Sequence, residues 1–190
     1  MTSDAAWLSS HAFLLLVDAP VVRDGVDRAR SAGLRGVVLA PSTLQSAGDT
    51  EGLTVAAVVG WPSGRHHTLV KAAEARLAVA QGATEIWLAT DPHIADPNAL
   101  LAEIVAVREA VPPPVTLAVH LDAGRGADSA RALAEAAALA GAERLVGTSM
   151  SGDLPHTLLA DSLDAVIDAL DAGADRVAVS DVAAVCPPPR

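Results

Sequence analysis

His120 and Asp122 stand two residues apart at the end of an apolar run, residues 116–121, that is typical of a buried strand. Side chains alternate along a strand, so these two should point to the same side. A histidine beside a carboxylate suits general acid–base catalysis, because imidazole exchanges protons near neutral pH. We therefore expect His120 and Asp122 to be catalytic. The alternatives are that Asp122 caps the next helix and that His120 is a hydrogen-bonded core histidine.

Two further carboxylates follow other apolar runs. Asp18 comes directly after residues 13–17, and Asp91 comes directly after residues 85–90. If these runs are parallel strands of one barrel, their carboxyl ends meet at one face, where Asp91 could share a proton with His120. Both are candidate catalytic groups, although Asp18 could equally be structural.

Two tryptophans fall near the same strand ends. Trp87 lies within the run 85–90, and Trp61 follows another run. Their flat rings would favour an aromatic, polyketide-like or otherwise apolar substrate; the alternative is that they only fill space. Ser149 and Asp181 follow two later apolar runs and complete the predicted substrate-binding set.

The elements that must position these residues alternate along the chain. Apolar runs predict strands at residues 13–17, 36–40, 54–59, 85–90, 116–121, 144–148 and 176–180. Ala-rich amphipathic segments predict helices at 23–32, 68–81, 97–110, 127–140 and 162–172. Such alternation predicts a parallel sheet with right-handed crossovers. With 190 residues and about seven clear strands, we expect an α/β fold, a truncated or distorted (β/α) TIM-type barrel forming one domain over residues 1–190.

Composition argues against several functions. A net charge of -10 disfavours nucleic acids and anionic membranes, so neither is an expected partner. No apolar run approaches the roughly 20 residues of a membrane helix. The N-terminal segment lacks the basic region of a signal peptide and Cys186 is the only cysteine, which together predict a cytoplasmic protein. His66, His67 and His93 lack a metal-binding spacing, so no metal or cofactor is expected.

Three sequence blocks keep a recognisable order and spacing: VVGWPSG at 58–64, TLVKAAEA at 68–75 and GATEI at 82–86. Together they resemble the deoxyribose-phosphate aldolase family. Weaker similarities occur at 17–18, 38–42, 121–124 and 147–149, so the resemblance covers about residues 13 to 182. It implies a TIM barrel, and an activity that depends on a Schiff base between a lysine and the substrate.

By that resemblance, the residues that the family uses are replaced. The Schiff-base lysine falls at Gly147, the strand-five lysine at Ala118 and the proton-relay aspartate at Trp87, and the lysine-bearing segment of strand seven is missing. Lys71 is the only lysine of the chain, and its place in the helix 68–81 predicts a solvated side chain. Imine formation needs an amine, so the family's chemistry is not expected here.

The sugar-phosphate site that the resemblance implies is altered as well. The turn after the last predicted strand carries Asp181, whose charge would repel a phosphate from nearby backbone donors. We interpret the segment between Ser149 and Ser162 as replacing a deleted βα unit, which would explain the missing eighth strand.

These features favour a repurposed enzyme that uses lysine-independent acid–base catalysis on a non-phosphorylated, fairly apolar small molecule, in secondary metabolism. Cyclisation, isomerisation, dehydration and carbon–carbon bond cleavage all fit. The alternative is a non-catalytic, aldolase-like binding protein or partner subunit, and an ordinary aldolase is the least compatible reading. A short barrel with an open sheet edge would also favour a homo-oligomer, because such an edge needs a partner.

Overall fold

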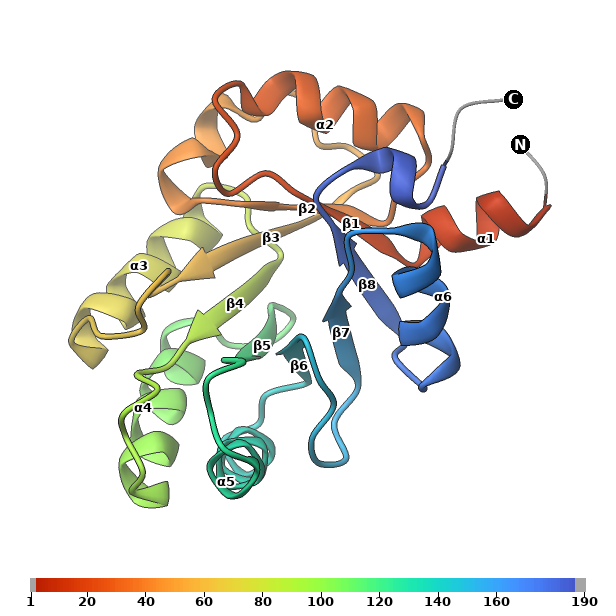
Figure 1. Cartoon of the computed structure of the whole chain (residues 1–190). Helices are drawn as coiled ribbons and strands as arrows, with labels where there is room; N and C mark the ends of the chain where they lie inside the picture. The colour runs from red at the N-terminus through yellow and green to blue at the C-terminus, as the bar shows by residue number, and fades with distance from the viewer. Residues whose placement is uncertain (1–2, 187–190) are drawn as a thin grey trace.

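The computed structural model describes residues 3–186 and shows eight parallel strands closed into a barrel. Each strand pairs with the next along the chain, and β8 pairs with β1 to close the ring. The strands are β1 (Ala12–Leu15), β2 (Gly36–Leu39), β3 (Thr54–Val59), β4 (Glu85–Ala89), β5 (Thr116–Leu121), β6 (Arg144–Gly147), β7 (His156–Leu159) and β8 (Arg176–Val179). Figure 1 shows them around the centre of the molecule.

Helices form the outer layer of the barrel (Figure 1). They are α1 (Ser3–Ser10), α2 (Val22–Ser31), α3 (Thr68–Ala80), α4 (Pro97–Ala110), α5 (Ala127–Leu139) and α6 (Leu163–Asp171), with 3₁₀ turns η1 (Pro41–Ser46) and η2 (Val182–Ala184). A 3₁₀ turn therefore takes the place of a longer helix between β2 and β3, and residues 148–155 connect β6 to β7 without a helix. None of the helices within residues 3–186 is both long and apolar enough to cross a membrane.

The predicted TIM-type barrel is confirmed, with eight strands rather than about seven. The strand that the sequence analysis missed is β7, which lies inside the segment interpreted as a deletion. This strand has only four residues, His-Thr-Leu-Leu, and two of them are polar. Its sequence therefore does not show the apolar run that is typical of a buried strand. What this part of the barrel lacks is a helix and not a strand.

Two apolar layers hold the barrel together. A large outer cluster lies between the strands and the helices, where small alanines let the helices approach closely. A smaller inner cluster fills the barrel itself; its buried members are Phe13, Val38, Ala56, Val58, Trp87, Ala118, Val146 and Ala178. The only two large aromatic rings of this inner cluster, Phe13 and Trp87, lie 5.9 Å apart between centroids.

A buried ion pair closes the amino-terminal end of the barrel interior. Glu85 begins β4 and Arg176 begins β8, and Arg176 Nη1 lies 2.9 Å from Glu85 Oε2. The other carboxylate oxygen accepts a hydrogen bond of 2.8 Å from Trp87 Nε1. The Arg176 guanidinium also lies 5.5 Å from the centroid of the Phe13 ring. One oxygen of Glu85 pairs with Arg176 and the other accepts from Trp87, so the orientation of the Trp87 indole is fixed from the amino-terminal end of the barrel.

Candidate functional site

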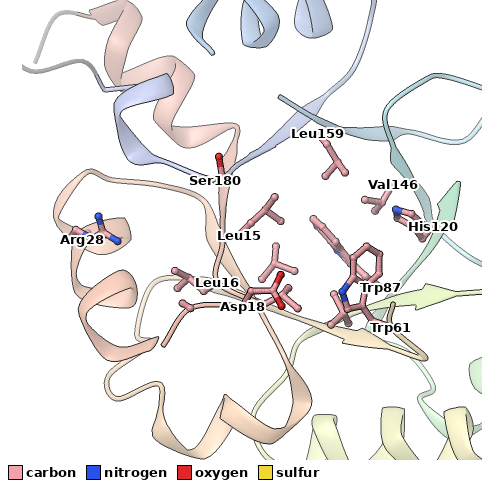
Figure 2. Close-up of a pocket in the computed structure, with 14 residues that line it drawn as sticks. Leu15, Leu16, Asp18, Arg28, Trp61, Trp87, His120, Val146, Leu159 and Ser180 are labelled. Atoms are coloured by element: carbon pink, nitrogen blue, oxygen red, sulfur yellow. The ribbon is translucent and has the colours of Figure 1, made fainter. Parts of the chain in front are cut away.

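A cavity of about 420 Å³ opens at the carboxyl ends of the strands, where barrels of this type carry their sites. Figure 2 shows it with its lining side chains. The lining is Leu15, Leu16, Val17, Asp18, Ala19, Arg28, Val38, Val58, Trp61, Trp87, His120, Val146, Leu159 and Ser180. Its volume fits a small organic molecule, and a mostly apolar wall with a few polar groups is typical of such sites.

His120 lies on β5 and faces this cavity. Its imidazole makes no hydrogen bond with any residue between 3 and 186, so it differs from a hydrogen-bonded core histidine. Burial lowers the pKa of the His120 imidazole; the nearby charge of Asp122 opposes this shift and the charge of Arg125 adds to it. Burial therefore favours the neutral ring, which is the form that accepts a proton.

The two predicted tryptophans form the aromatic part of the wall. Trp61 and His120 meet edge to face, with ring centroids 5.4 Å apart and planes inclined at 85°. Trp87 is almost fully buried and forms the floor, whereas Trp61 is 39% exposed at the mouth. A tight turn after β3 presents Trp61: the Gly64 N–H donates to the Gly60 carbonyl at 2.8 Å.

Polar groups from other elements line the opposite side of the cavity. The Asp18 carboxylate, three residues beyond the end of β1, points into the cavity in Figure 2 and has no hydrogen bond or ion pair with any residue between 3 and 186. Arg28 on α2 and Ser180 after β8 also contribute. Neither was predicted from sequence, because Arg28 comes from a helix and Ser180 carries no distinctive motif. The Ser180 hydroxyl donates to Asp161 Oδ1 at 3.1 Å.

The predicted acids Asp91 and Asp122 do not line the cavity. Asp122 Oδ1 accepts from the Gly124 N–H at 2.7 Å, so it shapes the turn before α5, whose N-cap is Gly126. Asp91 Oδ1 accepts from the His93 N–H at 2.9 Å, which helps to lower the pKa of the Asp91 carboxyl. Asp122 thus acts on His120 through its charge, and Asp91 is engaged in its own loop.

Arg125 joins the loops that carry these two acids. It donates to Thr90 Oγ1 at 2.9 Å and to the Asp91 carbonyl at 2.7 Å. A cation therefore bridges the loop after β5 to the loop after β4, on the side of the cavity where His120 lies. This bridge gives the rim a fixed shape and places a positive charge near the imidazole.

Ser149 and Asp181 also lie outside the cavity lining. Ser149 is exposed in the segment between β6 and β7. The Asp181 carboxylate accepts from the Ala183 N–H at 3.1 Å and so caps η2. A backbone donor that could have met an anionic ligand is thereby occupied by the protein's own carboxylate.

The barrel register decides which residues of β6 face the cavity. Gly147 shares the outer side of β6 with Leu145, and a Cβ on Gly147 would lie 2.7 Å from the Leu121 carbonyl oxygen. Val146 is the inward residue that lines the cavity. On β7 the lining residue is Leu159. Aliphatic side chains therefore occupy the cavity-facing positions of β6 and β7.

The prediction that Lys71 is solvated is wrong. Its side chain is fully buried between α3 and α4, where Nζ lies 2.9 Å from Glu103 Oε1. The partner is 32 residues away along the chain, so no local pattern reveals it. Lys71 is not among the residues that line the cavity.

Within residues 3–186, no three or more His, Cys, Asp or Glu side chains gather closely enough to hold a metal ion. The lining offers one imidazole, one carboxylate, one guanidinium and one hydroxyl in an otherwise aliphatic and aromatic wall. Neutral imidazole and free carboxylate suit proton transfer to and from a bound molecule.

These features define a closed, eight-stranded TIM-type α/β barrel, with a cavity that fits a small molecule at the face where such barrels carry their sites. No protein-family model matches the chain. Known relatives are nevertheless found: a deoxyribose-phosphate aldolase of Nocardia farcinica is 44% identical over 108 residues, which are 55% of this chain and 48% of the relative. A deoxyribose-phosphate aldolase of Corynebacterium glutamicum is 40% identical over 130 residues, 65% of this chain and 58% of the relative.

A solved tetrameric deoxyribose-phosphate aldolase from Aeropyrum pernix shares the fold. It superposes with a TM-score of 0.83 at 22% identity, covering 95% of this chain and 90% of that one. The predicted resemblance to the deoxyribose-phosphate aldolase family is therefore confirmed. The matched segments span between about half and three fifths of the length of these two curated relatives.

Proposed function

We propose that the protein is an enzyme that transfers protons on a small, apolar, non-phosphorylated carbonyl compound, with His120 as the general base and without a Schiff base. The observation that carries this proposal is the His120 imidazole in an apolar cavity whose lining contains no lysine. The imidazole makes no hydrogen bond with residues 3–186, and burial lowers its pKa. Its relationship to aldolases supports a carbonyl substrate, because aldolases act beside carbonyl groups.

The proposed step conserves atoms and charge. His120 accepts a proton from the carbon next to the carbonyl, and the electron pair of that C–H bond moves to give an enolate. The imidazolium then returns the proton. Return to the same carbon is exchange, return to another carbon is isomerisation, and departure of a β-hydroxyl as water is dehydration. Asp18, across the cavity, is the second group that can hold a proton, and the Asp122 charge stabilises the imidazolium.

Proton exchange tests this proposal before the natural substrate is known. Aromatic and alicyclic ketones are incubated with the protein in D₂O, and loss of the α-proton signal is followed by NMR. His120→Asn should lower the exchange rate about 10²-fold or more, because the base is removed. His66→Asn, an exposed histidine before α3, is the matched control and should keep the rate. Equal rates for His120→Asn and the native protein would refute the assignment.

A binding function without catalysis is the second candidate, favoured by the largely apolar lining of the cavity. Tight binding of a ketone with no exchange above the buffer rate would select it. Trp61 and Trp87 would then serve as the contact surface for the ligand, and His120→Asn would alter affinity without any change in proton exchange.

We also infer that the protein self-associates. The barrel is closed, so the open sheet edge that was expected to need a partner does not exist. However, α3 exposes Leu69, Val70 and Leu77, each by more than half. Exposed apolar side chains grouped on one helix favour a protein contact, and one structural relative is tetrameric. Light scattering at several concentrations tests this, and Leu69→Glu/Leu77→Glu should yield the monomer. Cytoplasmic location and a place in secondary metabolism remain predictions.

A further inference from the structure

Glu74 on α3 reaches back to the turn that carries Trp61. The Gly60 N–H donates a hydrogen bond of 2.8 Å to Glu74 Oε2. Gly60 directly follows β3 and directly precedes Trp61. A side chain of the outer helix layer therefore fixes the backbone at the rim of the cavity, and a hydrogen bond to a charged acceptor is among the stronger kinds.

Lys71 closes the space behind the same glycine. A Cβ on Gly60 would lie 3.1 Å from Lys71 Cε and 3.0 Å from the Ala89 carbonyl oxygen. The φ of Gly60 is 74°, a left-handed conformation that glycine adopts without strain. The lysine stem is itself held by the ion pair with Glu103. Gly60 is thus enclosed between α3 and β4 and has little room to shift.

Trp61 depends on this anchor because its own side chain is only partly packed. It is 39% exposed, and His120 is the aromatic ring that it meets within residues 3–186. Removing the backbone anchor would free the turn to carry the indole away from the imidazole. Water would then reach the imidazole face that Trp61 now covers.

We propose that Glu74 is a positioning residue of the site: through its hydrogen bond to Gly60, and with Lys71 packed behind, it holds Trp61 against His120. Residues 68–75, which resemble the aldolase family, would then have a structural role in this chain that does not involve an amine nucleophile. The inference deepens the proposed function but concerns the geometry of the cavity, so it can be tested without a substrate.

The test is an NMR comparison of four variants with the native protein. Glu74→Ala removes the acceptor and keeps a good helix former. Glu74→Gln supplies an amide oxygen that can accept the hydrogen bond from Gly60. Glu74→Asp keeps the charge, but its side chain is one methylene shorter and places the carboxylate farther from Gly60. Glu109→Ala on α4 is the control, because Glu109 is exposed and has no hydrogen-bond partner within residues 3–186. The readouts are the NOE between the Trp61 and His120 rings and the titration of His120.

Glu74→Ala should lose the NOE, and the pKa of His120 should rise towards its ordinary value as water relieves the burial that lowers it. Glu74→Gln and Glu109→Ala should behave as the native protein. If Glu74→Ala does not fold, Glu74→Asp provides the same comparison and should weaken the NOE. A native NOE and a native titration in folded Glu74→Ala or Glu74→Asp would overturn the proposal.

This result is separable from that of the proposed function. A lost NOE in Glu74→Ala, with no proton exchange in the native protein, would support the positioning role and reject the catalytic one. Proton exchange by the native protein, together with an unchanged NOE in Glu74→Ala, would support the catalytic role of His120 and reject the positioning role of Glu74.

Discussion

The Nζ atom of Lys71 lies 2.9 Å from Glu103 Oε1, and both side chains are buried. The only lysine of the chain thus forms an ion pair that joins the outer helices α3 and α4. A lysine that is fully buried in this pair and absent from the cavity lining is not placed to attack a bound carbonyl compound. The chain therefore shares the fold of the aldolases while its single amine has a structural position.

Breaking this pair should destabilise the fold. Lys71→Met removes the ion pair and leaves the buried Glu103 with only a long hydrogen bond of 3.5 Å from Thr68 Oγ1. Loss of one partner of a buried pair typically costs about 3–5 kcal/mol of unfolding free energy. Lys71→Met/Glu103→Leu replaces the pair by apolar side chains of similar size and should recover most of that loss. Urea denaturation monitored by circular dichroism measures both variants. A Lys71→Met protein as stable as the native one would show that Glu103 finds water or another partner.

Protonation of His120 should occur below the ordinary imidazole pKa of 6.5, because burial disfavours the charged ring. Asp122 raises this pKa by its charge, so Asp122→Asn should lower it further while its side-chain oxygen still accepts from Gly124. If neutral His120 is the base, the rate is constant near pH 7 and falls as the pH drops through the lowered pKa. NMR titration gives the pKa, and the pH–rate profile gives the acidic limb. A higher pKa in Asp122→Asn would contradict this electrostatic account.

Phosphorylated ligands should bind worse than their unphosphorylated parents. The cavity lining contains one cation, Arg28, and one carboxylate, Asp18, which would repel a phosphate. The Asp181 carboxylate already accepts the hydrogen bond of the Ala183 N–H in η2. For a hydroxyketone and its phosphate ester, we expect the ester to bind at least about tenfold more weakly, or about 1.4 kcal/mol. Quenching of tryptophan fluorescence measures both affinities. Tighter binding of the ester would instead indicate that Arg28 and nearby backbone donors form a phosphate site.

An introduced lysine should distinguish the two sides of β6. Val146→Lys places an amine in the cavity, whereas Gly147→Lys directs it to the outer side, where its Cβ would meet the Leu121 carbonyl. Val146→Lys should form an imine with a small aldehyde, releasing water, and borohydride should reduce that imine to a stable amine. Gly147→Lys should destabilise the protein without a cavity adduct. Mass spectrometry reports the labelled peptide, and equal labelling of both variants would show that the register assignment is wrong.

Much of the barrel could be predicted because its strands are apolar and its helices amphipathic. The structure reproduces the limits predicted for the strands 54–59 and 116–121 and for the helix 97–110, which begins with Asp96 as N-cap and Pro97 in its first turn. The strand β7 was missed because two of its four residues are polar. The helix α1 was also missed, since its pattern has little amphipathic contrast.

Sequence could predict which side chains reach the cavity where alternation along a strand decides their direction. Alternation brings Trp87 and His120 to the cavity as expected, and Asp18 and Trp61 reach it from the ends of β1 and β3. Sequence could not show that Asp91 and Asp122 would engage their own loops, because such turns depend on loop conformation. The burial of Lys71 depends on a partner in another helix, and the sequence pattern of one helix does not contain it.

The measurement that tests the central claim most directly is borohydride trapping of the native protein with a small aldehyde, followed by peptide mapping. We predict no reduced adduct at Lys71, while Val146→Lys, treated in parallel, is labelled at the new lysine. Proton exchange on ketones should meanwhile persist in Lys71→Met/Glu103→Leu, because the methionine keeps a flexible side chain of similar size behind Gly60. Exchange should be lost in His120→Asn. A stoichiometric adduct at Lys71 of the folded native protein would contradict the account, because the buried lysine would then be the reactive amine of a Schiff-base enzyme.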